Sequence, residues 1–594
     1  MKLLIFRLAL AALFLTGWAL RSAAAESAVR QIDMGVYTVL TNVRSERKVV
    51  SWVEKFDLQR RAAQQLIGLG DEQVLPLTVL LVEKDRDFDE LLSPTRRPVM
   101  GYAPERLWVQ SVGLGRQPMI ALSLAAGSSD AEAKVRGALA MWLLSSAGVA
   151  YDHWVVQGFL HLFGEAAIRG GWITVGQRNE HNVGVLKNYA DDFDFNLERA
   201  SLPPALAWLA VRTLAIRDGK WNGFAGITRY QELAATGMPK ERAFAEGTGL
   251  SVSAMNAALR REVRDNSYGV VRVTSDVRKQ HAAVAAHPAT TGLWDLNRAR
   301  FFVQLSGADR DEALRMIDLA AQELPPDDPG PSEVRWLYAL LTQQPGLAAE
   351  SLTKAIDLGT KNHAMRLQWC MDVINEGIRS SGGIIIPGKQ AVRAADLLAG
   401  VARVYPESLQ APRLMASLMP SVNPAREADR RLIEKARERH PDDTVLRLGL
   451  IAWRWRHGDL TGASEQMEAM KPGPDDTAYV QSYLNWLRAQ LDAEERLLAV
   501  EDAVSRGEFM EAGAAFNGIQ AQNPLMPATM ERYRNAKRVI QYYNLTVRAR
   551  KFIDESQPAL AEALVVDLEK VDLPPALRSR VEALRKRLPR PSEP

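Results

Sequence analysis

The chain has 594 residues, of which 47% are hydrophobic and 24% charged, and its formal net charge is +3 at pH 7. That composition is ordinary for a globular protein, and the length predicts two or three domains rather than one. A single cysteine, Cys370, excludes an intramolecular disulfide framework and a cysteine-rich zinc module.

The first 25 residues have the pattern of a secretory signal peptide. Lys2 and Arg7 precede or flank an apolar run over 8–20, and alanines at 23–25 supply a cleavage site. The basic residues of this leader account for the whole net charge, so the cleaved chain is formally neutral. A neutral chain without a long basic run is a poor binder of nucleic acid. We therefore predict a secreted, periplasmic protein with no nucleic-acid partner and no integral membrane segment after signal cleavage; the alternative is an uncleaved N-terminal anchor.

Residues 26–275 are expected to form one α+β domain. Its first part, 26–125, is mixed: a helical pattern over 46–68 lies among segments with strand patterns at 35–43, 75–83, 105–114 and 117–126. Its second part, 126–275, has mainly helical periodicity. From 276 to 594 the pattern is helical throughout, with breaks at proline-rich joints such as "LPPDDPGP" and "KPGPDD". The fold class predicted is an α+β domain followed by an all-α solenoid.

Three segments of the helical part share one spacing of small and apolar residues. They resemble the second helix of a tetratricopeptide repeat (TPR), in which a small residue lets two helices approach closely. The matching residues are Ala313, Ile317, Ala320 and Pro325; Gly458, Ala463, Met467, Met470 and Pro474; and Gly507, Ala512, Phe516, Ile519 and Pro524. The alternative is a generic helical bundle, because the first helices and the repeat spacing are irregular.

The segment from Val36 to Val263 resembles the gluzincin-like metallopeptidase domains that precede TPRs in some bacterial secreted proteins. The resemblance lies in the order of "YTVLTN", "WVEKFDLQRRA", "LTVLLVEKDRDFDEL", "WVVQGFL" and "MPKERAFAEGTGLSVSAMNAALRREV". It implies a zinc site built from His-Glu-x-x-His on one helix and a glutamate on the next helix. Two histidines at i and i+4 share one helix face, and the intervening glutamate serves as base.

The residues that such a zinc site requires are missing from this chain. The helix that should carry the motif reads "RGALAMWLL", so the ligand positions fall on Gly137, Ala138, Met141 or Trp142, depending on the frame. In the next helix Gln157 stands where the glutamate ligand belongs. We therefore predict no metal, no cofactor and no catalytic residue, with Ala138, Trp142 and Gln157 as vestigial zinc positions.

Three histidines are the weak alternatives for a catalytic group. His153 and His161 flank Gln157 at four-residue intervals, and the two lie about 12 Å apart along a helix axis, too far to share one zinc ion. His181, in "RNEHN", reaches the same region only through a loop. His153 and His161 are expected to be exposed or capping histidines.

The leading hypothesis is a secreted, non-catalytic protein-interaction scaffold that joins a pseudo-metallopeptidase domain to TPR-like repeats, with a protein or peptide of unknown identity as its partner. One alternative is a hydrolase of unrecognised mechanism that uses the vestigial cleft. Another is a purely architectural first domain that caps the solenoid.

Overall fold

The computed structural model describes residues 29–92, 107–110, 118–124, 129–147, 149–169, 171–188, 194–199, 201–235, 238–266, 268–275, 284–304, 310–381, 385–406, 408–424, 426–470, 478–519 and 524–588. The predicted signal peptide and Pro474 lie outside these ranges. The chain divides into two compact units. Unit 1 comprises Met1–Trp369 and Val401–Ser408, and unit 2 comprises Cys370–Gly400 and Leu409–Pro594.

Unit 1 contains a six-stranded mixed sheet in the order β11-β1-β2-β3-β5-β4. β2, β3 and β5 are parallel, and β11, β1 and β4 pair with their neighbours in antiparallel fashion. The strands are β1 (Arg30–Asp33), β2 (Tyr37–Thr41), β3 (Leu77–Val82), β4 (Leu107–Gln110), β5 (Met119–Ser123) and β11 (Ala286–Pro288). The four strand segments predicted within 26–125 each contain one of these strands, which confirms the α+β character of this region.

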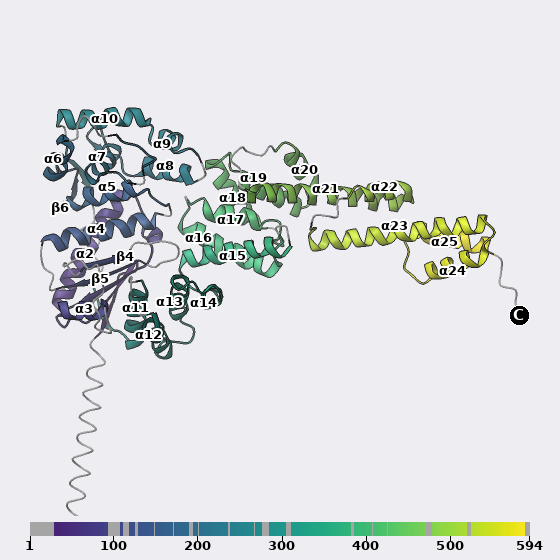
Figure 1. Ribbon diagram of the computed structural model, residues 1–594, viewed down its shortest axis with the longest axis horizontal. Helices are drawn as coiled ribbons and strands as arrows, with labels where there is room; N and C mark the ends of the chain where they lie inside the picture. The colour runs from purple at the N-terminus through teal and green to yellow at the C-terminus, as the bar shows by residue number, and fades with distance from the viewer. Residues whose placement is uncertain are drawn as a thin grey trace, which may run out of the picture. The chain divides into compact units, whose positions relative to one another are not determined.

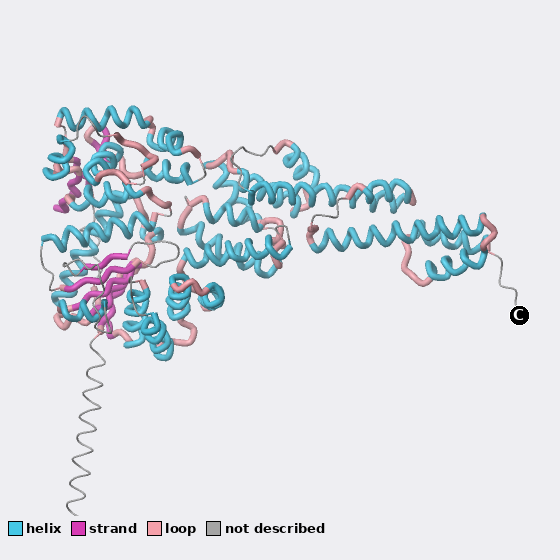
Figure 2. The backbone as a smooth tube through the Cα atoms, viewed as in Figure 1, coloured by secondary structure: helices cyan, strands magenta, loops and turns pink. Residues whose placement is uncertain are grey.

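Helices of unit 1 lie on both faces of this sheet, and others pack on those helices (Figures 1 and 2). They are α2 (Glu46–Ile67), α3 (Asp85–Leu92), α4 (Ser129–Ser146), α5 (His153–Gly164), α6 (Glu180–Asn188), α7 (Pro204–Ala215), α8 (Ala225–Ala235), α9 (Lys240–Thr248), α10 (Val252–Asp265), α11 (Thr291–Val303), α12 (Arg310–Glu323), α13 (Gly330–Leu341) and α14 (Pro345–Asp357), with a 3₁₀ turn at Asp71–Gln73. Alternation along β3 sends Val79 and Leu81 into the core shared with α2 and α4. It sends Leu80 and Val82 into the core shared with α3, α11 and α12.

Two smaller sheets interrupt the region predicted to be mainly helical. β6 (Ala167–Arg169), β7 (Trp172–Val175) and β10 (Val271–Thr274) form an antiparallel sheet in the order β10-β7-β6, and β8 (Ile216–Arg217) and β9 (Lys220–Trp221) form a hairpin. The expectation of helix throughout from 276 onward is wrong at β11, which pairs with β1. These strands have two to four residues and, unlike β4, lie within no longer segment that the sequence predicted as a strand, so they were not recognised.

The remaining helices form hairpins from residue 363 to the end of the described chain. They are α15 (His363–Ser381), α16 (Gly388–Val404), α17 (Gln410–Leu418), α18 (Glu427–Arg439), α19 (Thr444–Arg456), α20 (Leu460–Glu468), α21 (Ala478–Arg506), α22 (Phe509–Asn517), α23 (Pro527–Asp554), α24 (Pro558–Glu569) and α25 (Pro575–Arg587). In the described residues, no helix is both long enough and apolar enough to cross a bilayer.

The three segments that match a tetratricopeptide repeat each form the second helix of a helical hairpin. α12 pairs with α11, α20 with α19 and α22 with α21 (Figure 1). Ala313, Ala463 and Ala512, the small residues of the three matches, are all fully buried. Gly458 and Gly507 have positive φ between the paired helices, a conformation that favours glycine. The chain therefore contains a TPR-like array of helical hairpins.

Candidate functional site

α4 and α5 carry the positions that the sequence resemblance assigns to zinc ligands. Ala138 and Trp142 lie on α4 and are each 2% exposed, whereas Gln157 is half-buried on α5. The Trp142 indole Nε1 donates a hydrogen bond of 2.8 Å to the Leu75 carbonyl, and its ring meets Tyr37 edge-on. The α4 positions are therefore part of the hydrophobic core rather than the wall of a polar cleft.

Gly158 brings α5 into close contact with α7. A Cβ atom on Gly158 would lie 2.3 Å from the Ala207 carbonyl oxygen and 2.4 Å from Val211 Cγ2. Only glycine allows this approach, since both distances are well below van der Waals contact. α5 is thus fixed on α7 immediately after the Gln157 position.

The side chains at the vestigial positions do not fit a zinc ion. A methyl group, an indole and a carboxamide stand where two imidazoles and a carboxylate are needed, and Trp142 uses its only polar atom on Leu75. Among the residues that the structure describes, no group of three or more His, Cys, Asp or Glu side chains is placed to hold a metal ion. No reaction step through a metal is derived at this site, and the prediction of a metal-free protein stays a prediction.

The structure brings two of the three candidate histidines together. His161, half-buried on α5, interacts electrostatically with His181 on α6, while exposed His153 lies at the other end of α5. Burial lowers the pKa of His161, nearby Glu165 raises it and His181 lowers it. Glu165 also accepts a hydrogen bond of 2.7 Å from Asn179. The pair has no neighbouring nucleophile in any described contact, so no catalytic role is assigned to it.

Sequence reasoning missed a pocket at the far end of α5. It has a volume of about 540 Å³ and lies among α2, α4, the end of α5 and the strand β6. Its lining residues are Lys55, Leu58, Gln59, Arg136, Gly164, Glu165, Ala166, Ala167, Ile168 and Arg169. Arg136 belongs to the "RGALAMWLL" segment, but no sequence pattern indicates the three-residue strand that it faces.

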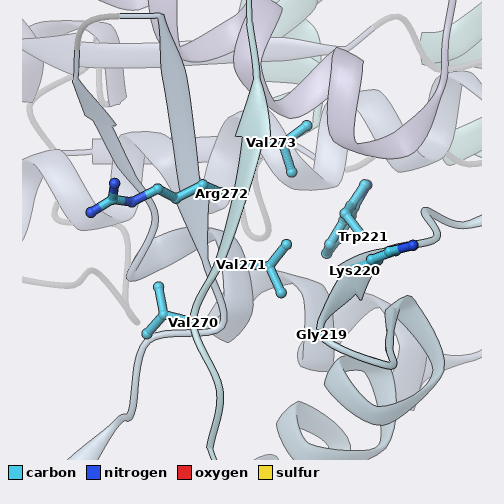
Figure 3. Close-up of a pocket in the computed structure, with 7 residues that line it drawn as sticks. All are labelled: Gly219, Lys220, Trp221, Val270, Val271, Arg272 and Val273. Atoms are coloured by element: carbon cyan, nitrogen blue, oxygen red, sulfur yellow. The ribbon is translucent and has the colours of Figure 1, made fainter.

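A second pocket, of about 600 Å³, lies between the β8–β9 hairpin and β10. Figure 3 shows Val271 and Val273 directed toward Trp221, while Arg272 points to the opposite side of the strand. Its lining contains no carboxylate, hydroxyl or thiol side chain. This pocket therefore offers mainly apolar and cationic contacts, and the Lys220 amine is the lining side chain that could take part in acid–base or nucleophilic chemistry.

Comparisons with known proteins assign no family to the chain. No family model matches it, and no curated protein matches it. Among solved structures, it is similar to the crystal structure of the P58(IPK) TPR domain, with 13% sequence identity over 50% of this chain and 98% of that chain and a TM-score of 0.19. A similarity at that TM-score supports no conclusion, so the description of TPR-like hairpins rests on the buried small residues and paired helices described above.

Proposed function

We propose that this protein is a secreted, periplasmic, non-catalytic interaction scaffold. In this proposal residues 26–275 are a degenerate gluzincin-like metallopeptidase domain, to whose sheet β11 adds an edge strand, the helical hairpins within 276–594 are TPR-like repeats, and the leader at 1–25 directs export. Paired helical hairpins stacked along a chain offer an extended surface of the kind that binds proteins or peptides.

The observation that carries the non-catalytic part of the proposal is the packing of α4. Ala138 and Trp142 occupy the expected ligand positions and are buried in the core, and Trp142 is tied to the Leu75 carbonyl. The order of a strand, a helix, a strand and then the α4–α5 pair supports the resemblance to gluzincins. A zinc ion would need ligands where this core is apolar.

The test combines metal analysis with peptide binding on the purified full-length protein. The protein is incubated with a displayed library of random dodecapeptides, and retained peptides are sequenced and weighed by mass spectrometry. The proposal expects retained peptides of intact mass and far less than one zinc per chain. Stoichiometric zinc together with chelator-sensitive cleavage would overturn it.

The same assay distinguishes the alternative of a hydrolase with an unrecognised mechanism. Cleavage that persists without zinc and disappears in His161→Ala would establish the hydrolase and refute the scaffold. A library with no retained and no cleaved peptide would also contradict the scaffold and favour a purely architectural protein.

A further inference from the structure

Among the described strands, none pairs with the outer edge of β6, which is the last strand of the sheet β10-β7-β6. In the β10-β7-β6 sheet, the Ser275 N–H donates to the directly opposite Gly171 carbonyl, which sets the alternation of hydrogen-bonded pairs along β7 and β10. The residues of β7 that do not bond to β10 are Trp172 and Thr174, and these lie opposite Arg169 and Ala167 of β6. Ala167 and Arg169 are therefore the residues of β6 whose main chain bonds to β7. The N–H and C=O of Ile168 therefore point away from the sheet.

Arg136 of α4 lies along this open edge. Its Nη1 donates a hydrogen bond of 3.1 Å to the carbonyl of Ala166, two residues before Ile168 and outward-facing in the same alternation. The Arg136 Nε is buried and has no hydrogen-bond partner among the described residues. The main-chain N–H and C=O of Ile168 likewise have no partner in the part of the chain that the structure describes. A buried donor without a partner is unfavourable, and an unpaired strand edge is a template on which another chain can pair.

The pocket beside this edge carries an excess of positive charge. Lys55, Arg136 and Arg169 line it together with one carboxylate, Glu165, whose Oε1 accepts from Asn179. Its volume of about 540 Å³ lies in the range of small-ligand and peptide pockets. The pocket at β10 is a weaker candidate, since Gln65 already donates to the outward carbonyl of Thr274 and the β8–β9 hairpin lies against that edge.

We propose that this pocket binds an extended acidic segment of a partner protein, which adds as a strand to the edge of β6. The segment exchanges main-chain hydrogen bonds with Ile168, and the carboxylate of an Asp or Glu side chain accepts from the guanidinium of Arg136. Main-chain pairing supplies affinity, and the charge-assisted contact supplies selectivity for acidic sequences. This inference deepens the proposed function and rests on it.

The first experiment uses two fluorescent heptapeptides, acetylated and amidated at their ends, of sequence Ser-Thr-Val-Glu-Val-Thr-Ser and the same sequence with lysine at the centre. Anisotropy with the full-length protein is expected to show at least tenfold tighter binding of the glutamate peptide. Only one residue of the bound peptide is expected to exchange main-chain hydrogen bonds with Ile168. N-methylation of that residue removes its N–H and should weaken binding at least tenfold, whereas N-methylation of either neighbouring residue should not. Equal binding of the two peptides, no binding of either, or equal effects of methylation at every position would overturn the proposal.

The second experiment changes the protein. Arg136→Gln is expected to weaken binding of the glutamate peptide at least tenfold and to leave the lysine peptide unaffected, and Arg136→Lys should retain most of the affinity. Lys220→Gln, which removes a cation from the pocket of Figure 3, is the matched control and should change nothing. An unchanged affinity in a folded Arg136→Gln protein would refute the role of this pocket. Library peptides retained elsewhere on such a chain would leave the scaffold function intact.

Discussion

Gly158→Ala should destabilise unit 1 more than its small size suggests. The added methyl group would lie 2.3 Å from the Ala207 carbonyl oxygen, about 1 Å inside ordinary contact, and main-chain atoms of α7 cannot rotate away. Overpacking of this kind costs up to about 3 kcal/mol. Alanine also gains about 1 kcal/mol over glycine in helix propensity, so the net loss is about 2 kcal/mol.

A matched control lies on the same helix. Gly164 ends α5, and a Cβ atom there would meet nothing within 4 Å, so Gly164→Ala should be neutral or stabilising by up to about 1 kcal/mol. Urea denaturation of the full-length variants, with hydrogen exchange of peptides from α5 and α7, measures the difference. If Gly158→Ala proves as stable as Gly164→Ala, the close contact between α5 and α7 is wrong.

The hairpin array offers the same contrast. In Gly449→Ala the new Cβ would lie 2.4 Å from a methyl group of α17, so this variant should lower the free energy of unfolding by about 2 kcal/mol. Gly513→Ala should not lower it, because the space around that Cβ is open. Urea midpoints of the two variants decide this, and equal midpoints would contradict the packing of α17 and α19. Burial lowers the pKa of His363 to about 4, with a smaller contribution from a nearby arginine. Between about pH 6.5 and pH 4 the imidazole is therefore protonated in the unfolded chain but neutral in the folded protein, so folding becomes less favourable as the pH falls. Wild-type protein should then lose about 2 kcal/mol more stability than His363→Gln between pH 7.5 and 4.5, after allowance for partial exposure; an equal loss would refute the burial of this imidazole. Burial holds the pKa of His161 below its ordinary value and Glu165 opposes that shift, so Glu165→Gln should lower the pKa further in an NMR titration, and a rise would contradict the contact.

The parts of the fold that sequence patterns predicted are those with long or repeated signals. The continuous apolar run "LTVLLV" predicted β3, a strand whose six residues are all buried. The spacing around Ala512 predicted α22, the second helix of the α21–α22 hairpin, because burial of one helix face imposes a period of 3.6 residues. β6 and β11 have three residues each and carry no period, so they were missed. The pairing partner of β11 is also distant in the chain, because β1 lies about 250 residues before it.

The candidate site was predictable only in part. The absence of a His-Glu-x-x-His motif can be read directly from "RGALAMWLL", and "WVVQGFL" has a glutamine where the resemblance expects a glutamate. The burial of Trp142 depends on its contacts with Leu75 and Tyr37, which no sequence spacing encodes. The approach of His161 to His181 and the position of Arg136 beside β6 arise from tertiary contacts between α4, α5, α6 and β6. The predicted domain boundary at 275, the roles of the vestigial residues and the export of the protein stay predictions.

The hydrogen bond between the Trp142 indole and the Leu75 carbonyl has a consequence for any attempt to introduce a zinc site on α4 by mutation. Histidine at position 142 would remove an indole that is 2% exposed and leave the Leu75 carbonyl without its hydrogen-bond donor. Histidine at position 138 would place an imidazole where the structure holds only the buried methyl group of Ala138. Replacing a buried tryptophan with a smaller side chain costs about 3–5 kcal/mol, and the unpaired carbonyl adds about 1–3 kcal/mol. Such a loss rivals the whole stability of an ordinary domain, so the packing of α4 in this chain opposes the introduction of a metal site at these positions.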